Sequence, residues 1–236
     1  MASILDIPLR VPLNEIKEAR FYEQFREALI WLRGPKRSGK TATALKIMRC
    51  LFKYFGQFPV LNFHPYPAFG EYKYVGDNEF IELLKIAGDT IKEGLAKGLS
   101  DEVIWKQLDC IYGFPFRHST WLFDEGYQNF RRVRAGSNLV LAHGDFIAGP
   151  GSHGQVTAIV CSPGDELTYR LTKDQVTITF NCGYSRVTNR VCARGYNPAT
   201  GHGLIIWTDI DEVKDWYNTH SPVAVTQTKR PKIKLV

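Results

Sequence analysis

Hydrophobic residues along the chain form short uninterrupted runs that alternate with segments of helical periodicity. Uninterrupted apolar runs are typical of strands that are buried on both faces of a parallel sheet. Such runs occupy residues 28–32, 59–63, 119–123 and 155–161. Residues 41–55 lie between the first two runs, carry apolar side chains at helical spacing, and end before Gly56. This alternation predicts an α/β fold with a largely parallel central sheet flanked by helices.

Two other regions depart from this alternation. Residues 77–112 show two successive helical patterns, which predict a helical insert, whereas the proline-rich segment 64–74 before them predicts a loop. Near the C-terminus, residues 176–180 alternate with period two, and strands are expected at 185–192 and 203–207, which predicts C-terminal β-hairpins. A short helix should follow, with Val213, Trp216 and Tyr217 on it.

No internal repeat or clear linker divides the sequence, so we expect one domain over residues 1–236. The tail from residue 226 to 236 is basic, with Lys229, Arg230, Lys232 and Lys234. A charged tail of this kind is usually a solvated tail, and it is also compatible with contact to a nucleic-acid backbone.

Composition excludes several classes of protein. The chain has 236 residues, 44% of them hydrophobic, and a net charge of +6, which is compatible with a polyanionic partner. No apolar run approaches the roughly 18–20 residues of a membrane span, so we expect a soluble, intracellular protein. The five cysteines form no C-x-x-C pair, and Cys182, Cys192 and His202 fall short of a tetrahedral zinc site. We therefore expect reduced, mostly buried thiols.

The most specific motif in the chain is a phosphate-binding loop at residues 34–41. It fits G-x-x-x-x-G-K-[ST] at every fixed position, and it follows a predicted strand and opens a predicted helix. In that context backbone N–H groups surround the phosphates, Lys40 reaches the β- and γ-phosphates, and the Thr41 hydroxyl binds Mg²⁺. We expect ATP or GTP to be bound by Gly34, Pro35, Lys36, Arg37, Ser38, Gly39, Lys40, Thr41 and Thr43.

The run at 119–123 ends in two acids and has the form of a Walker B strand. Asp124 stands where a carboxylate holds Mg²⁺, and Glu125 stands where a carboxylate polarises a water for attack on the γ-phosphate. Two adjacent acids favour hydrolysis, since metal binding alone requires only one. The alternative is an acidic turn after a buried strand.

Further charged and polar residues extend this candidate site. Arg131, Arg132 and Arg134 follow the acidic pair, and one of them is a candidate for the cation that reaches the γ-phosphate of a neighbouring subunit. A solvated helix start and a contact to a DNA phosphate are the alternatives. Ser162 follows the run at 155–161, where a polar residue can sense the γ-phosphate; the alternative is a surface serine.

The order of these motifs resembles the genome-packaging ATPases of the FtsK/HerA superfamily of P-loop proteins. Residues 124–132 are similar to the family's Asp-Glu segment that runs into an arginine-bearing helix, and residues 216–223 are similar to an element that closes many of its members. The resemblance covers roughly residues 27–223.

This resemblance implies a three-layer, RecA/ASCE-like fold and an Mg²⁺-dependent ATPase that translocates double-stranded DNA into a viral capsid. It also implies a homo-oligomeric ring, often a hexamer, with capsid or membrane-vertex proteins as further partners. The location would be the cytoplasm of a prokaryotic host or the virion.

Two other functions use the same loop. A small-molecule or nucleoside kinase also binds ATP this way, although it has less use for the Asp-Glu pair. A nucleotide-gated assembly factor that does not hydrolyse ATP is the third hypothesis, with Glu125 in a structural role.

Overall fold

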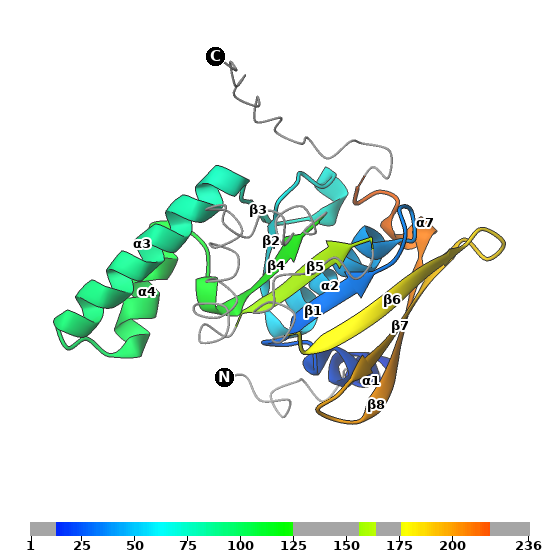
Figure 1. Ribbon diagram of the computed structural model, residues 1–236, viewed down its shortest axis with the longest axis horizontal. Coiled ribbons are helices and arrows are strands. Elements are labelled where there is room, and N and C mark those ends of the chain that lie inside the picture. Colours follow the sequence, from blue (N-terminus) through cyan, green and yellow to red (C-terminus); the bar gives the residue numbers. More distant parts are fainter. Residues whose placement is uncertain (1–12, 125–155, 164–175, 218–236) are drawn as a thin grey trace, which may run out of the picture.

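A single mixed β-sheet forms the centre of the molecule (Figure 1). The computed structural model describes residues 13–124, 156–163 and 176–217. Within these residues the sheet has eight strands in the order β3-β2-β4-β5-β1-β6-β7-β8. The strands are β1 (Leu29–Arg33), β2 (Phe58–Leu61), β3 (Lys73–Tyr74), β4 (Ser119–Phe123), β5 (Thr157–Ser162), β6 (Ile178–Ser185), β7 (Arg190–Asn197) and β8 (His202–Asp209).

The strands β1 to β6 all run parallel to one another, whereas β7 runs antiparallel to both of its neighbours, β6 and β8. β5 lies between β1 and β4, with Ala158 paired to Leu29 on one side and to Trp121 on the other. β6 continues the parallel part beside β1, and β7 and β8 follow it as hairpins. The inserted strand β5 therefore separates the strand that leads into the phosphate loop from the strand that ends at Asp124.

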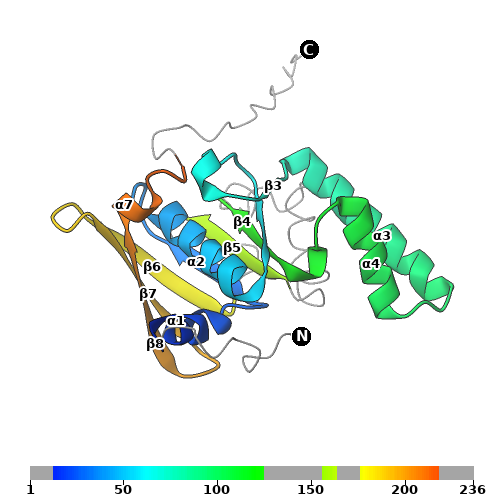
Figure 2. The same cartoon turned by 180° about the vertical axis from the view of Figure 1, so that it is seen from behind.

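One face of the sheet is covered by the helix that follows the phosphate loop. This helix, α2 (Lys40–Phe55), buries Leu45, Ile47, Met48 and Leu51 against inward-facing residues of the strands. The N-terminal helix α1 (Leu13–Glu23) and the single-turn α7 (Ile210–Val213) pack against α2 on the same side. Figure 2 shows these three helices together in front of the sheet.

Aromatic side chains cover the other face of the sheet. They come from α3 (Asp77–Ala96), α4 (Asp101–Tyr112) and the 3-10 turn Phe116–His118, and they surround Trp121 and Phe123 of β4. Phe80 meets Trp121 edge-on at 5.7 Å, and Phe116 meets it at 5.9 Å. Helices thus lie on both faces of a mostly parallel sheet, which confirms the predicted three-layer α/β fold.

The structure corrects two of the predicted elements. The segment 64–74 is not entirely a loop, because it contains a 3-10 turn at Pro67–Phe69 and the short edge strand β3. The strand expected at 185–192 is wrong: β6 ends at Ser185, and a turn at 186–189 reverses the chain into β7. Asn189 occupies the left-handed region in this turn (φ 51°), so the reversal uses no glycine, the usual marker of such a turn.

The basic tail 226–236 lies outside the described residues. The expected helix near residue 213 is shorter than predicted, and Trp216 and Tyr217 follow it. Among the described helices, none is long and apolar enough to cross a membrane.

Candidate nucleotide-binding site

Residues 34–41 form a tight loop between β1 and α2, and two of its glycines have no room for a side chain. Gly34 has φ 150°, and an added Cβ would lie 2.5 Å from Ser38 Oγ and 2.7 Å from the carbonyl oxygen of Cys182. Gly39 has φ 87°, and its Cβ would lie 2.1 Å from a methyl group of Val191. The fixed glycines of the motif are therefore required by backbone conformation and by close contact with β6 and β7.

The side chain of Lys40 spans the loop. Its Nζ donates hydrogen bonds to the carbonyl oxygens of Gly34 and Pro35, at 2.8 Å each. The ammonium group is thus held over the loop, beside the N-terminus of α2, where Gly39 offers no capping side chain. A helix N-terminus with a lysine beside it is suited to bind a phosphate group.

Thr41 and Asp124 are brought together from positions 83 residues apart. The Thr41 hydroxyl donates to the carboxylate of Asp124, at 3.0 Å from Oδ1 and 3.2 Å from Oδ2. A hydroxyl and a carboxylate are hard oxygen ligands of the kind that Mg²⁺ prefers, so these residues fit an Mg²⁺ site. Mg²⁺ bound there would neutralise phosphate charge, and Lys40 and the loop N–H groups would orient a triphosphate.

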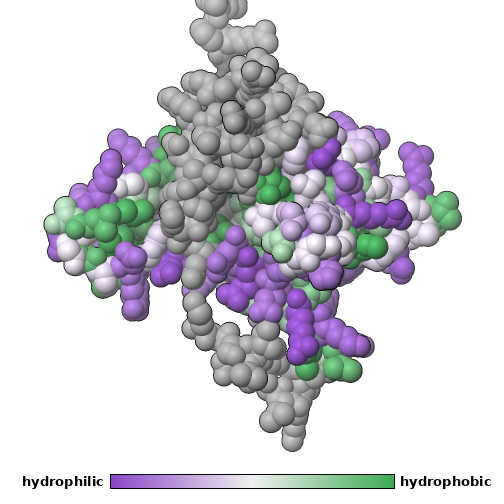
Figure 3. Space-filling model, turned by 60° about the horizontal axis from the view of Figure 1, so that its bottom comes forward, coloured by the Kyte–Doolittle hydropathy of each residue, from purple (hydrophilic) through white to green (hydrophobic). Residues whose placement is uncertain are grey.

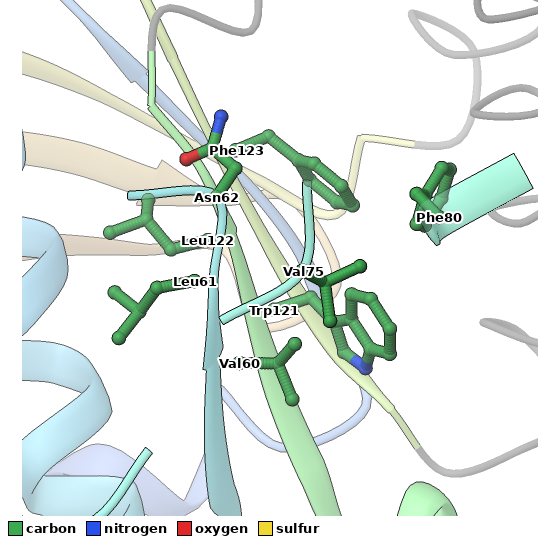
Figure 4. Close-up of a pocket in the computed structure, with 8 residues that line it drawn as sticks. All are labelled: Val60, Leu61, Asn62, Val75, Phe80, Trp121, Leu122 and Phe123. Carbon is green, nitrogen blue, oxygen red and sulfur yellow. The ribbon is translucent and has the colours of Figure 1, made fainter. Parts of the chain in front are cut away.

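Asn62, which the sequence analysis did not single out, fixes the position of Asp124. Its Nδ2 donates to the carbonyl oxygen of Asp124, and its Oδ1 accepts from the Asp124 backbone N–H, both at 3.0 Å. Figure 4 shows Asn62 beside Phe123 at the end of β2, beyond the apolar residues of the two strands. The signal in the sequence was a single polar residue inside the run 59–63.

Ser162 lies in the protein interior at the end of β5. Its Oγ accepts a hydrogen bond from Trp31 Nε1 at 2.9 Å, and its carbonyl oxygen accepts from the Gly34 N–H at 3.2 Å. The alternative of a surface serine is wrong, because the residue is 0% exposed. Its contact with Gly34 places it at the base of the loop, and a role in sensing the γ-phosphate stays a prediction.

Two buried cysteines lie below the site. Burial raises the pKa of the Cys161 thiol well above its usual range, and the nearby Asp124 carboxylate raises it further. Burial also raises the pKa of Cys182 to about 12, although a hydrogen bond with the Thr43 side chain and the charge of Lys40 oppose this shift. Both thiols are therefore protonated near neutral pH, so neither adds negative charge near Lys40.

The C-terminal described segment packs against the turn at Tyr66 and against Arg49 of α2. The backbone N–H of Tyr66 donates to the Trp216 carbonyl oxygen at 2.6 Å, and the Arg49 guanidinium lies 5.1 Å from the centre of the Trp216 ring. Burial raises the pKa of Tyr217, and the Asp124 carboxylate contributes to the same shift. Tyr217, which the sequence placed on a terminal helix and in the segment 216–223, is therefore part of the surroundings of Asp124.

The remaining predicted site residues are placed as follows. Lys36 and Arg37 are exposed at the crest of the loop, and Arg37 has a left-handed backbone (φ 65°). Thr43 donates from its hydroxyl to the Gly39 carbonyl oxygen at 3.1 Å. Glu125, Arg131, Arg132 and Arg134 lie outside the described residues, so their roles stay predictions.

No protein-family model matches this chain, and no curated protein sequence matches it either. Among solved structures, the N-terminal domain of zonular occludens toxin from Neisseria meningitidis matches at 14% identity, covering 81% of this chain and 99% of that one, with a TM-score of 0.49. The genome-packaging NTPase B204 from Sulfolobus turreted icosahedral virus 2, in complex with ATP-gammaS, matches at 13% identity. The match covers 76% of this chain and 96% of that one, with a TM-score of 0.46. The flagellar accessory protein FlaH from Methanocaldococcus jannaschii matches at 11% identity. The match covers 76% of this chain and 84% of that one, with a TM-score of 0.38. Each of these TM-scores is below 0.5, so the likeness to these structures carries no functional argument.

Proposed function

We propose that this chain binds and hydrolyses ATP with Mg²⁺ at the loop 34–41. The observation that carries this proposal is the contact between the Thr41 hydroxyl and the Asp124 carboxylate, next to the Lys40 ammonium. It joins the end of β4 to the start of α2 and so brings the expected Mg²⁺ ligands to one side of the expected phosphate site. A bare acidic turn after a buried strand would not require this contact.

Hydrolysis requires, in addition, a base for the attacking water. Glu125 directly follows the Mg²⁺ ligand Asp124 in the sequence, so the two carboxylates are assigned different tasks in this proposal. Asp124 orients the metal, and Glu125 accepts the proton from water as it attacks the γ-phosphate.

The ATPase is proposed to form a homo-oligomeric ring and to act as a motor that moves double-stranded DNA into a viral capsid. Support comes from the resemblance of residues 124–132 and 216–223 to the FtsK/HerA packaging ATPases, together with the net charge of +6. Positive charge favours contact with the DNA backbone independently of sequence, and such contact weakens as salt rises.

The proposal is tested by measuring phosphate release from ATP with and without double-stranded DNA. The motor predicts release that needs Mg²⁺ and rises when DNA is added, and Lys40→Ala should lack it under both conditions. Turnover that requires a small-molecule acceptor would instead indicate a kinase. Tight ATP binding without any turnover would indicate a nucleotide-gated assembly factor.

An arginine acting across a subunit boundary has its own test. Ala variants of Arg131, Arg132 and Arg134 should bind ATP normally, and the variant that lacks the acting arginine should not hydrolyse it. Mixing that variant with Lys40→Ala chains should restore part of the activity, because one chain supplies the loop and the other the arginine. A monomer that hydrolyses ATP at the full rate would exclude a shared site.

A further inference from the structure

The α3–α4 pair carries a groove that the rest of the described chain leaves open. We call this the helical groove; it has a volume of about 690 Å³, and its lining includes Ile86, Asp89, Val103, Cys110 and Ile111. The apolar members are well exposed, at 39% for Ile86, 42% for Val103 and 52% for Ile111. Figure 3 shows hydrophobic side chains gathered over these helices at the left end of the molecule.

The helical insert is acidic, whereas the whole chain is basic. Residues 77–112 contain eight acidic and four basic side chains, although the chain as a whole has a net charge of +6. The lysines of the groove are already paired, Lys97 with Glu93 at 3.3 Å and Lys106 with Glu102 at 3.0 Å. Asp89 forms no ion pair with any residue in the described ranges, so it is a carboxylate without an ion-pair partner in a groove whose two lysines are already paired.

The turn between β6 and β7 has the opposite character. Val187 at its tip is 96% exposed and Tyr184 beside it is 40% exposed. Residues 184–194 contain three arginines and no acid. Arg190 pairs with Asp209 at 3.4 Å, whereas Arg186 has no ion-pair partner in the part of the chain that the structure describes. The β6–β7 turn is thus an exposed apolar tip with a free positive charge.

These two surfaces lie at opposite ends of the longest axis of the molecule, as both ribbon views show (Figures 1 and 2). One chain cannot bring them together, but two copies can. We propose that the β6–β7 turn of one copy docks into the helical groove of the next copy, with Val187 and Tyr184 against the apolar lining and Arg186 against Asp89. The contact is head-to-tail, so it leaves a free groove and a free turn on each pair and can add further copies.

This inference goes beyond the proposed function by naming the surfaces that join the copies, and it depends on that function only through self-association. Binding of the turn in the groove is measured without ATP hydrolysis. An inactive ATPase would therefore leave the inference intact, and a failed contact would leave the loop 34–41 as an ATPase site.

The native Cys110 in the groove provides the first test. A Val187→Cys chain should form disulfide-linked dimers and longer head-to-tail multimers under mild oxidation, because the new thiol would sit beside Cys110 of the next copy. The Val187→Cys/Cys110→Ser chain is the matched control and should lose them. We would run both chains alone, with Mg·ATP, and with DNA. Absence of the dimer in all three conditions, or an equal dimer yield in the control, would overturn the proposal.

A charge exchange provides the second test, because it does not alter a buried residue. Asp89→Arg and Arg186→Asp should each weaken self-association, by about tenfold or more, when followed by light scattering. Mixing the two single-change chains places unlike charges at every contact between one kind of chain and the other, so the mixture should assemble again. Combining both changes in one chain should also restore assembly. Assembly that is unaffected by either single change, or that neither the mixture nor the combined change recovers, would show that the copies meet elsewhere.

Discussion

Gly39→Ala tests whether the loop 34–41 is shaped by its contact with β7. An alanine at φ 87° costs about 1–2 kcal/mol because its Cβ is strained in the left-handed region. Its Cβ would also lie 2.1 Å from a methyl group of Val191, which is fully buried, so β7 or the loop must shift. Overpacking of this kind costs about 1–3 kcal/mol, which gives a total loss in the free energy of unfolding of roughly 2–5 kcal/mol.

The other end of the same helix provides the matched control. Gly56 also has a left-handed backbone (φ 66°), but an added Cβ would meet nothing within 4 Å. Gly56→Ala should therefore lose only the backbone contribution of about 1–2 kcal/mol. Urea unfolding of both variants measures the difference, and part of the loss should be recovered in a Val191→Ala background, where Gly39→Ala should cost less than it does in the wild-type chain. Equal losses in the free energy of unfolding for the two variants, or no recovery, would show that the contact with β7 is not why position 39 requires glycine.

Three further predictions concern the site. Glu125→Gln should keep Mg·ATP bound and lower hydrolysis by roughly 10²–10⁴-fold, as measured by phosphate release, because an amide cannot accept the proton from water; a wild-type rate would assign Glu125 a structural role. Asn62→Ala should raise the Mg²⁺ concentration needed for half-maximal hydrolysis, since Asp124 loses two backbone hydrogen bonds; an unchanged Mg²⁺ dependence would contradict the role given to Asn62. Burial favours the protonated form of the Cys182 thiol in the folded state, so the contribution of this thiol to stability is full below pH about 9 and is lost as the pH rises towards about 12. Cys182→Ala should therefore reduce the loss of stability at alkaline pH in unfolding experiments. An identical pH profile for the variant and the wild-type chain would contradict this role of Cys182.

Periodicity and motif spacing predicted the central part of this fold well. The runs at 28–32, 59–63, 119–123 and 155–161 correspond to β1, β2, β4 and β5, because strands buried on both faces give continuous apolar sequences. Thr41 and Asp124 were likewise assigned to one metal site from sequence, and the structure brings their side chains within 3.0 Å.

The turn at 186–189 could not be predicted in the same way. Its reversal depends on Asn189 adopting a left-handed conformation, and neither glycine nor proline marks it in the sequence.

Asn62 and Tyr217 were missed as neighbours of Asp124 for a related reason. Their positions depend on strand order and on how the C-terminal segment packs, and these are non-local properties. A single polar residue inside an apolar run is too common to indicate a hydrogen-bonding partner 62 residues away.

The most direct test of the central claim is a calorimetric titration of a non-hydrolysable ATP analogue into the wild-type chain and into Lys40→Ala, with and without Mg²⁺. We predict tight binding to the wild-type chain that depends on Mg²⁺, and its loss in Lys40→Ala, because the loop backbone alone leaves the β- and γ-phosphate charge undercompensated. Equal affinity of the two chains for the analogue, or binding that ignores Mg²⁺, would contradict the assignment of residues 34–41 and Asp124 as a magnesium–triphosphate site.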